Sequence, residues 1–202
     1  IIFCNIASVN ALDDGNDFST ELQNELNKSN RDFKSVDLFN VQTSTLIPLI
    51  DNDKKNIIVF NTDKYSLVSN YIDSLNWSNK SNKIILYIEY GWQNVNALNI
   101  QNFCVAPFKI DYNGTEYKKF NSDFSKYYNW KATSSSPRYD ILGYDLTNYF
   151  VAQIYNNGKN FSTKKNKLPL SMGIETKLSF ERSSDRTGFT NRQLFIIEHD
   201  TK

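Results

Sequence analysis

The segment RYDILGYDLTNYF, residues 138–150, holds the residue types in this chain that come nearest to a reactive site. It contains two Tyr-Asp pairs, one on each side of Gly143, and phenols and carboxylates are groups that general acid–base catalysis uses. The same segment begins a helical pattern of apolar residues, which comprises Leu142, Leu146, Tyr149, Phe150 and Ile154. Two interpretations are therefore open, a site that performs chemistry or a packing helix over residues 139–155.

The other residues that could react are isolated from one another. The single histidine, His199, stands three residues from the end, and chain ends rarely hold an ordered catalytic base. No Gly-rich dinucleotide motif or P-loop follows a strand-like segment. Cysteine and histidine do not cluster as zinc ligands do. We therefore expect no catalytic residue, no cofactor and no metal, and a protein that is not an enzyme.

The densest carboxylate group is DDGND, residues 13–17, which could suggest a calcium loop or a phospho-acceptor pocket. It lacks the alternating ligands and the closing glutamate of an EF-hand. A receiver-like α/β enzyme would need its acidic pocket at a strand end, whereas Asp13 and Asp14 lie well beyond theirs. A polar turn leading into a helix over residues 18–28 is the better interpretation.

Charge and hydropathy argue against two classes of partner. The chain has 202 residues with 23 Lys and Arg against 22 Asp and Glu, which gives a net charge of +1. Proteins that bind nucleic acid by neutralising phosphates carry a basic face, so we expect no nucleic-acid partner. No apolar run reaches the roughly 18 residues of a membrane-spanning helix, so we expect no membrane span in this chain.

Two cysteines, Cys4 and Cys104, each lie inside an apolar, strand-like segment. Free cysteines behave as small buried hydrophobes, and this is the state that we expect. A disulfide would need the two Cα atoms within about 7 Å, which a sequence does not decide, so their redox state stays open at this point.

Strand and helix patterns alternate through the first half of the chain. The strand candidates are apolar on both faces and occupy residues 1–8, 32–40, 55–62, 83–90 and 102–110. Helical stripes lie between them, the clearest at residues 66–75. Strands buried on both faces with helices between them are typical of a parallel sheet covered on both sides. We therefore predict an α/β fold with a five-stranded, Rossmann-like parallel sheet flanked by helices.

The second half is predicted to form a helical pair and a closing β-hairpin. An aromatic stripe predicts a helix over residues 115–129, which precedes the helix over residues 139–155. The last two strand patterns, residues 173–181 and 191–198, are predicted to pair as the hairpin.

The candidate ligand site follows from the predicted sheet, because ligands of open α/β sheets bind beyond the carboxyl ends of the strands. Trp92 is notable because it directly follows a strand in EYGWQN. Polar and aromatic residues at the other strand ends complete the predicted site. The candidate ligand-binding residues are Asn5, Ser8, Asn61, Thr62, Tyr90, Trp92, Phe108 and Asp111. Ordinary polar loops are the alternative, because every sheet of this kind has loops at that edge.

Motifs in a fixed order carry a family resemblance. They are Gly91-Trp92 after a strand, Pro107-Phe108-Lys109-Ile110-Asp111 at a crossover, Phe120 with Phe124 on a helix, Gly143-Tyr144-Asp145 on the next helix, and Gly188, Asn191, Leu194, Phe195 and Ile196 near the end. In this order they resemble the type I periplasmic-binding-protein family, the substrate-binding proteins of ABC transporters. They are most similar to the branch found beside LysM peptidoglycan-binding modules. The resemblance covers residues 57–198 well and residues 1–40 loosely.

The resemblance implies that this chain is the second lobe of a two-lobe domain, with much of the first lobe outside the sequence. It divides the chain into an α/β lobe at residues 1–111, a helical segment at 112–168 that crosses toward the first lobe, and the closing hairpin at 169–202. It also implies that Tyr144 and Asp145 hold their helix in place by hydrogen bonds instead of performing catalysis. A second copy, another protein or the helix over residues 115–129 would then cover the apolar face of the helix over residues 139–155.

The function implied by the resemblance is that of a non-enzymatic binding domain in the periplasm or cell envelope. Its ligand would be a small molecule or a muropeptide. The alternative is a scaffold or protein-interaction domain of a LysM-type, peptidoglycan-associated protein that has no soluble ligand. An enclosed pocket at Asn61–Thr62 and Tyr90–Trp92 would favour the first function over the second.

Overall fold

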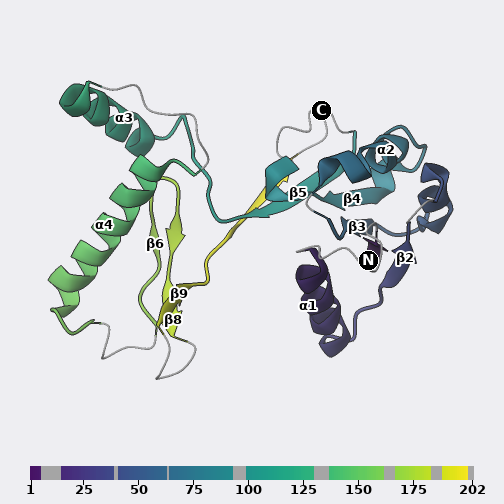
Figure 1. The fold of residues 1–202 in the computed structure, drawn as a ribbon, viewed down its shortest axis with the longest axis horizontal. Helices are drawn as coiled ribbons and strands as arrows, with labels where there is room; N and C mark the ends of the chain where they lie inside the picture. Colours follow the sequence, from purple (N-terminus) through teal and green to yellow (C-terminus); the bar gives the residue numbers. More distant parts are fainter. Residues whose placement is uncertain are drawn as a thin grey trace. The chain divides into compact units, whose positions relative to one another are not determined.

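Two compact units make up the chain, Ile1–Val105 together with Ile196–Lys202, and Ala106–Phe195. The computed structural model describes residues 1–5, 15–38, 41–62, 64–92, 99–129, 137–161, 167–182 and 188–199 (Figure 1). The division at residues 111 and 168 stays a sequence-based prediction.

The first unit is built on a six-stranded sheet with the order β10-β5-β4-β3-β1-β2 (Figure 1). Its strands are β1 (Ile2–Asn5), β2 (Lys34–Asp37), β3 (Asn56–Phe60), β4 (Ile84–Tyr87), β5 (Gln101–Ala106) and β10 (Phe195–His199). The pairs β1–β2, β1–β3, β3–β4 and β4–β5 are parallel. The predicted five-stranded parallel sheet is thus confirmed, and a sixth strand extends it beside β5.

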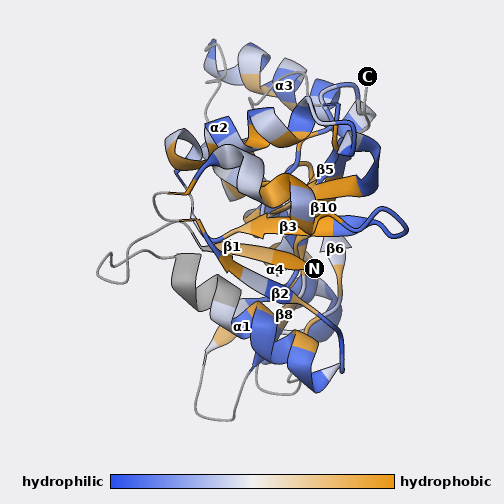
Figure 2. Ribbon diagram, turned by 90° about the vertical axis from the view of Figure 1, so that its right-hand side faces the viewer, coloured by the Kyte–Doolittle hydropathy of each residue, from blue (hydrophilic) through white to orange (hydrophobic). Residues whose placement is uncertain are grey.

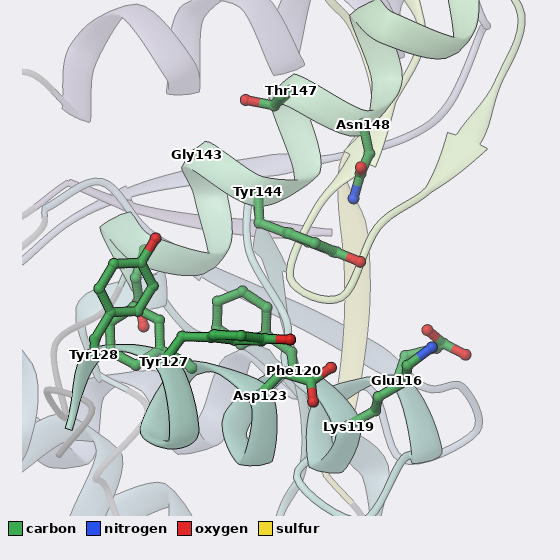
Figure 3. A pocket seen from close by; sticks show the side chains of 12 residues that line it. Glu116, Lys119, Phe120, Asp123, Tyr127, Tyr128, Gly143, Tyr144, Thr147 and Asn148 are labelled. Carbon is green, nitrogen blue, oxygen red and sulfur yellow. The ribbon is translucent and has the colours of Figure 1, made fainter. Parts of the chain in front are cut away.

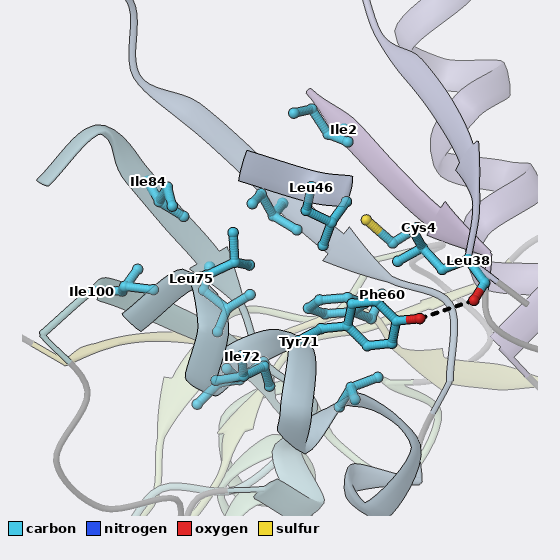
Figure 4. Packing of buried hydrophobic residues seen from close by; sticks show 14 of the residues in the cluster. Ile2, Cys4, Leu38, Leu46, Phe60, Tyr71, Ile72, Leu75, Ile84 and Ile100 are labelled. Atoms are coloured by element: carbon cyan, nitrogen blue, oxygen red, sulfur yellow. Dashed lines mark hydrogen bonds between the residues drawn. The ribbon is translucent and has the colours of Figure 1, made fainter. Parts of the chain in front are cut away.

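Alternating side chains of the strands build two hydrophobic cores. In β1, Ile2 and Cys4 belong to one core and Phe3 to the other, as the two-residue period of a strand requires. The first core includes side chains of α2 (Tyr65–Asn76) and of the 3-10 helix η1 (Thr43–Leu49) (Figure 4). The second includes side chains of α1 (Gly15–Lys28). Figure 2 shows the result, hydrophobic strands with amphipathic helices around them.

The two cysteines are free and buried. Cys4 lies on β1 and Cys104 on β5, with β3 and β4 between them. Three strand spacings of about 4.8 Å place them about 14 Å apart, twice the reach of a disulfide. The expectation of free, buried thiols is confirmed.

The second unit combines two helices with two short β-ladders. Helix α3 (Thr115–Tyr128) and helix α4 (Tyr139–Asn157) confirm the predicted helical pair. Strand β6 (Ser171–Met172) pairs antiparallel with β7 (Lys177–Leu178), and β8 (Phe180–Arg182) pairs antiparallel with β9 (Phe189–Asn191). The core of this unit consists of Tyr149, Leu168 and Leu178, with Leu146, Phe150, Phe161, Phe180 and Phe189 partly buried around them.

The closing hairpin is present, but it pairs different residues from those predicted. Residues 191–198 were expected to form its second strand, whereas β9 ends at Asn191 and the following residues form β10 in the sheet of the first unit. The Asn191 side chain ends the hairpin there. Its Oδ1 accepts the N–H of Ser179 at 2.9 Å, and its Nδ2 donates to the carbonyl of Lys177 at 2.9 Å. The next residues are then free to pair with β5.

Candidate functional site

Several of the predicted ligand residues lie at the carboxyl edge of the parallel sheet in the first unit. The order β2-β1-β3-β4-β5 changes direction between β1 and β3, and ligands of open α/β sheets bind at such a switch point. Asn5 ends β1, Asn61 and Thr62 follow β3, and the 3-10 turn η3 (Tyr90–Trp92) follows β4. The structure therefore brings these residues to the ends of neighbouring strands.

The polar residues after β3 are buried and form part of the chain turn. Asn61 is 6% exposed and Thr62 is 1% exposed. The backbone N–H of Asn61 donates to the carbonyl of Cys4 at 3.1 Å, which joins the ends of β1 and β3. The hydroxyl of Thr62 accepts the N–H of Lys64 at 3.2 Å, just before α2 begins. This edge of the sheet thus has a floor whose backbone is held by hydrogen bonds.

The aromatic residues after β4 differ in their surroundings. Trp92 is buried and meets Tyr65 edge-on, with ring centroids 6.0 Å apart. Its backbone N–H donates to the carbonyl of Glu89 at 2.9 Å. Tyr90 is only half-buried. Tyr90 therefore presents more surface to a ligand than Trp92, which forms part of the core beneath.

Three predicted site residues lie elsewhere. Ser8 is outside the described residues. Phe108 belongs to the second unit and forms a β-bridge with Thr176. Asp111 belongs to the same unit, where its Oδ1 accepts the N–H of Asn113 at 3.0 Å in the turn before α3. Their membership of a common ligand site stays a prediction.

A groove between α3 and α4 gathers side chains that the predicted site did not include (Figure 3). Its cavity has a volume of about 420 Å³. The aromatic lining residues are Phe120, Phe124, Tyr127, Tyr128 and Tyr144. The polar lining residues are Glu116, Lys119, Asp123, Asp140, Thr147 and Asn148. The groove lies wholly within the second unit.

Three rings form a ladder along α3. Phe120, Phe124 and Tyr128 are four residues apart, so they share one face of the helix. The first two ring centroids lie 5.8 Å apart with an interplanar angle of 27°, and the next pair lies 4.9 Å apart at 39°. Tyr144 points from α4 toward α3 and meets Phe120 edge-on at 5.0 Å (Figure 3). Both helices thus contribute to an aromatic wall.

Asp145 fixes the α4 side of this unit. It is 4% exposed, and its Oδ1 accepts the N–H of Ile174 at 2.8 Å. Its Oδ2 accepts the N–H groups of Glu175 and Thr176 at 2.9 and 3.0 Å, and the Thr176 hydroxyl at 2.9 Å. Consecutive N–H groups that converge on one anion form a nest. The expectation that Asp145 holds the helix by hydrogen bonds is confirmed, whereas the Tyr144 side chain makes no hydrogen bond within the described residues.

Gly173 allows this carboxylate to approach the chain. A Cβ at Gly173 would lie 2.3 Å from Oδ2 and from Cγ of Asp145, which is closer than any real contact. Gly143, on α4, is different, because nothing lies within 4 Å of the Cβ position there. A glycine is therefore needed at residue 173 for packing, but not at residue 143.

A buried charge cluster lies at the start of α4. Arg138 is 2% exposed, and its guanidinium donates from Nε to Asp140 Oδ1 at 3.1 Å and from Nη2 to Asp140 Oδ2. Nη1 donates to the Tyr117 hydroxyl at 3.3 Å. Burial acts to raise the pKa of Asp140, but the hydrogen bonds and charge of Arg138 outweigh burial and leave that pKa below its ordinary value.

Glu175 carries the least compensated charge of this cluster. It is 1% exposed, and its Oε1 accepts the backbone N–H of Arg138 at 2.9 Å. Its Oε2 is buried and has no hydrogen-bond partner in the part of the chain that the structure describes. Burial raises the pKa of Glu175, and the negative charge of Asp145 acts in the same direction. The Arg138 N–H opposes this rise only in part.

A second cavity of about 370 Å³ adjoins the groove and shares Glu116, Tyr144 and Asn148 with it. Its other walls include Gln153 on α4 and Met172 on β6. Tyr144 and Asn148 are therefore accessible to two cavities of the same unit.

Sequence reasoning missed the groove because it interpreted the aromatic stripe of residues 115–129 as a packing face. The signal that could have revealed the groove is the amino-acid composition of this aromatic stripe. The apolar residues of α3 are all aromatic, and none of its side chains is fully buried. A helix that packs into a core normally includes aliphatic side chains that become fully buried.

The fold defines an α/β protein with a parallel sheet and a second unit of two helices and a hairpin. Models of protein families give no match to this sequence, and no curated protein matches it. Within the described residues, no helix is long and apolar enough to cross a membrane. The same residues contain no group of three or more His, Cys, Asp or Glu side chains that could hold a metal ion.

Proposed function

We propose that this chain is a non-enzymatic binding domain of the cell envelope, similar to the second lobe of a type I periplasmic binding protein. The observation that carries the proposal is the strand order, which places β1 beside β3 and so creates a switch point at the carboxyl edge of the sheet. The resemblance in residues 91–92, 107–111, 143–145 and 188–196 supports the same class.

The groups at this edge suit a small polar ligand. Asn61 and Thr62 place amide and hydroxyl groups, both largely buried, at a strand end fixed by hydrogen bonds. The half-buried Tyr90 adds a ring and a hydroxyl after the neighbouring strand β4. Pockets with an apolar floor and a few polar groups are typical of small-molecule sites. An amino acid or a muropeptide has the size and polarity that this edge would accommodate.

A fluorescence titration tests the proposal. Replacing Trp77, which is 77% exposed, and Trp130 by Phe leaves Trp92 as the single tryptophan. The probes are the free amino acids and muramyl dipeptide, added to the full chain. We expect one of them to change Trp92 emission saturably and to raise the melting temperature, because a ligand stabilises the state that it binds.

The matched controls are Tyr90→Ala and Tyr155→Ala, which make the same change at the proposed site and at an exposed residue of α4. The first should abolish the emission change, and the second should leave it intact. An absence of any response to every probe, in this chain and in a longer protein that includes a first lobe, would exclude the solute-binding function.

A second function, that of a scaffold or protein-interaction domain, is favoured by one observation. Helix α4 exposes apolar surface at Val151, Ile154 and Tyr155, which are 59%, 49% and 88% exposed. Exposed apolar clusters mark contact surfaces in soluble proteins. This function needs no soluble ligand, and the partner would be a protein of the peptidoglycan layer or a second copy.

Sedimentation of the purified chain separates the two functions. A concentration-dependent dimer that Val151→Asp disperses would favour the scaffold function. A monomer at all concentrations, together with a saturable Trp92 response, would favour the solute-binding function. Both functions place the protein in the periplasm or cell envelope, and cell fractionation with an antibody against the full chain tests that location.

A further inference from the structure

We propose that the groove between α3 and α4 is a second binding site, and that it takes a neutral carbohydrate chain. This site goes beyond the proposed function, because it lies in the second unit and uses none of the residues at the carboxyl edge of the sheet. Its cavity of about 420 Å³ falls in the size range of small-ligand sites.

The spacing of the aromatic ladder fits an extended ligand. Phe120, Phe124 and Tyr128 recur every four residues, so successive rings advance by about 6 Å along the helix. Their planes are inclined to one another by only 27° and 39°. The three rings therefore form a continuous aromatic surface along one side of α3, against which a chain of sugar rings could lie. The negative face of an aromatic ring attracts the C–H groups that line one side of a sugar ring.

The polar lining offers both donors and acceptors. Lys119 donates, Glu116 and Asp123 accept, and Thr147 and Asn148 do both. In the described part of the chain, these five side chains form no hydrogen bond or ion pair with other residues. They are therefore available to a ligand without the loss of an existing contact.

This combination favours neutral, hydroxyl-rich ligands over other classes. An anion would be repelled by Glu116 and Asp123, and Lys119 beside them offsets part of their attraction for a cation. A purely apolar ligand would cover polar groups and leave them without partners, which costs free energy. A hydroxyl group both donates and accepts, so one sugar satisfies the two kinds of group while its C–H face covers the rings.

One wall of the groove, helix α4, is held in place before any ligand arrives. On the α4 side, Asp145 is fixed by four hydrogen bonds to Ile174, Glu175 and Thr176. At the start of the same helix, Glu175 accepts the backbone N–H of Arg138. A site that is already ordered binds without the entropic cost of ordering it.

Titration calorimetry and saturation-transfer NMR on the full chain test this proposal. The carbohydrate probes are N,N′,N″-triacetylchitotriose and cellotriose. Tetramethylammonium and a proline-rich peptide represent a cation and an aromatic-groove peptide. We expect saturable binding of at least one oligosaccharide and of neither other probe. Binding of the cation or the peptide alone, or of no probe, overturns the proposal.

The variants locate the binding. Gly143→Leu should obstruct the groove, because the Cβ position at residue 143 points into open space, and Gly143→Ala is its small matched control. Tyr144→Ala should weaken binding about ten-fold through the loss of an aromatic face. Each variant is first shown to keep the circular dichroism spectrum of the parent chain. Oligosaccharide binding that neither Gly143→Leu nor Tyr144→Ala weakens overturns the proposal.

The variant Tyr90→Ala keeps this test separate from that of the proposed function. This variant should bind the oligosaccharide with unchanged affinity. A weaker affinity would assign the sugar to the carboxyl edge of the sheet and overturn the groove site. The opposite outcome has two parts: Tyr144→Ala still shows a saturable Trp92 response to muramyl dipeptide, and the parent chain binds no oligosaccharide. That outcome would support the proposed function and overturn the groove site.

Discussion

At the scale of single residues, a side chain is excluded at Gly173 but can be accommodated at Gly143. Gly173→Ala would place a methyl group 2.3 Å from the Asp145 carboxylate, so the nest of N–H groups must open. We expect a loss of about 2–4 kcal/mol in the free energy of unfolding, because hydrogen bonds to a buried charge are broken. Urea unfolding, followed by circular dichroism, measures this loss.

The matched control is Gly143→Ala on α4. The added methyl meets no atom within 4 Å, and alanine has a higher helix propensity than glycine, so this change should stabilise the protein by up to about 1 kcal/mol. Equal destabilisation by the two substitutions would contradict the role given to the nest.

The buried Glu175 should make stability depend on pH in the direction opposite to that of an ion-paired carboxylate. Burial raises its pKa in the folded chain above the ordinary value of 4.5, so the folded state holds its proton to a higher pH than the unfolded state does. This contribution to stability therefore falls as the pH rises from about 4.5 through the folded pKa.

Glu175→Gln removes this titration while keeping an acceptor for the Arg138 N–H. The difference in unfolding free energy between this variant and the parent should grow from pH 4 toward neutral pH, in favour of the variant. Urea unfolding across that range checks it. A difference that shrinks as the pH rises would show that Glu175 is stabilised as a carboxylate.

The thiol of Cys4 should be inert in the folded chain. Burial raises its pKa to about 12, so the reactive thiolate is scarce, and Cys104 is equally inaccessible. Alkylation with iodoacetamide at pH 8.5 should label neither cysteine before unfolding and both in strong denaturant. Mass spectrometry counts the labels. Rapid labelling of the native chain would contradict the burial of Cys4 on β1 and Cys104 on β5.

At the scale of elements, α4 buries most of the face that its apolar pattern predicts, and two polar side chains besides. Tyr149 is buried, and Leu142, Leu146 and Phe150 are half-buried, whereas Ile154 is 49% exposed. Asp145 and Gln153 are also buried, and the nest of N–H groups holds the Asp145 carboxylate inside. A hydrophobicity pattern counts a carboxylate as an outward residue, so it does not locate a buried anion whose partners are distant backbone N–H groups.

Paired substitutions distinguish the buried part of the predicted face from its exposed end. Phe150 packs against Tyr149 and Phe180 with ring centroids 5.3 Å away in each case, so Phe150→Asp should cost about 3 kcal/mol through a charge placed among aromatic rings. Ile154→Asp should change stability by no more than about 0.5 kcal/mol, since half of that side chain is already in water. Thermal unfolding of both variants checks the order, and similar losses would show that Ile154 is buried as the pattern predicts.

At the scale of the whole molecule, the sequence predicted the sheet better than the sites. Strands β3 and β4 are continuous apolar runs, and local pattern is sufficient to identify such strands. Strand β10 alternates between half-buried and exposed residues, which fits a hairpin as well as a sheet edge. Strand β10 can be assigned to the sheet only once β9 is known to end at Asn191. That end depends on hydrogen bonds of the Asn191 side chain, which a local sequence pattern does not reveal.

The candidate ligand site stays a prediction, and the groove was missed for a similar reason. The rule for strand ends expects Asn61 and Tyr90 after neighbouring parallel strands, and they do follow β3 and β4. Phe108 and Asp111 belong to the second unit, and their part in a ligand site stays a prediction. The groove between α3 and α4 depends on how two helices approach each other, and Phe120 and Tyr144 are 24 positions apart in the sequence.

The position of β10 has a consequence for how the chain reaches its folded state. Strands β3 and β4 pair residues such as Asn56 and Ile84 across a connection of about 23 residues that contains α2, whereas β5 and β10 close a loop of about 90 residues. Long loops close slowly, so β10 should be the last strand to gain hydrogen-exchange protection during refolding. A second unit that is already folded shortens the flexible part of that loop. A defect such as Gly173→Ala should therefore delay the completion of a sheet in which residue 173 takes no part.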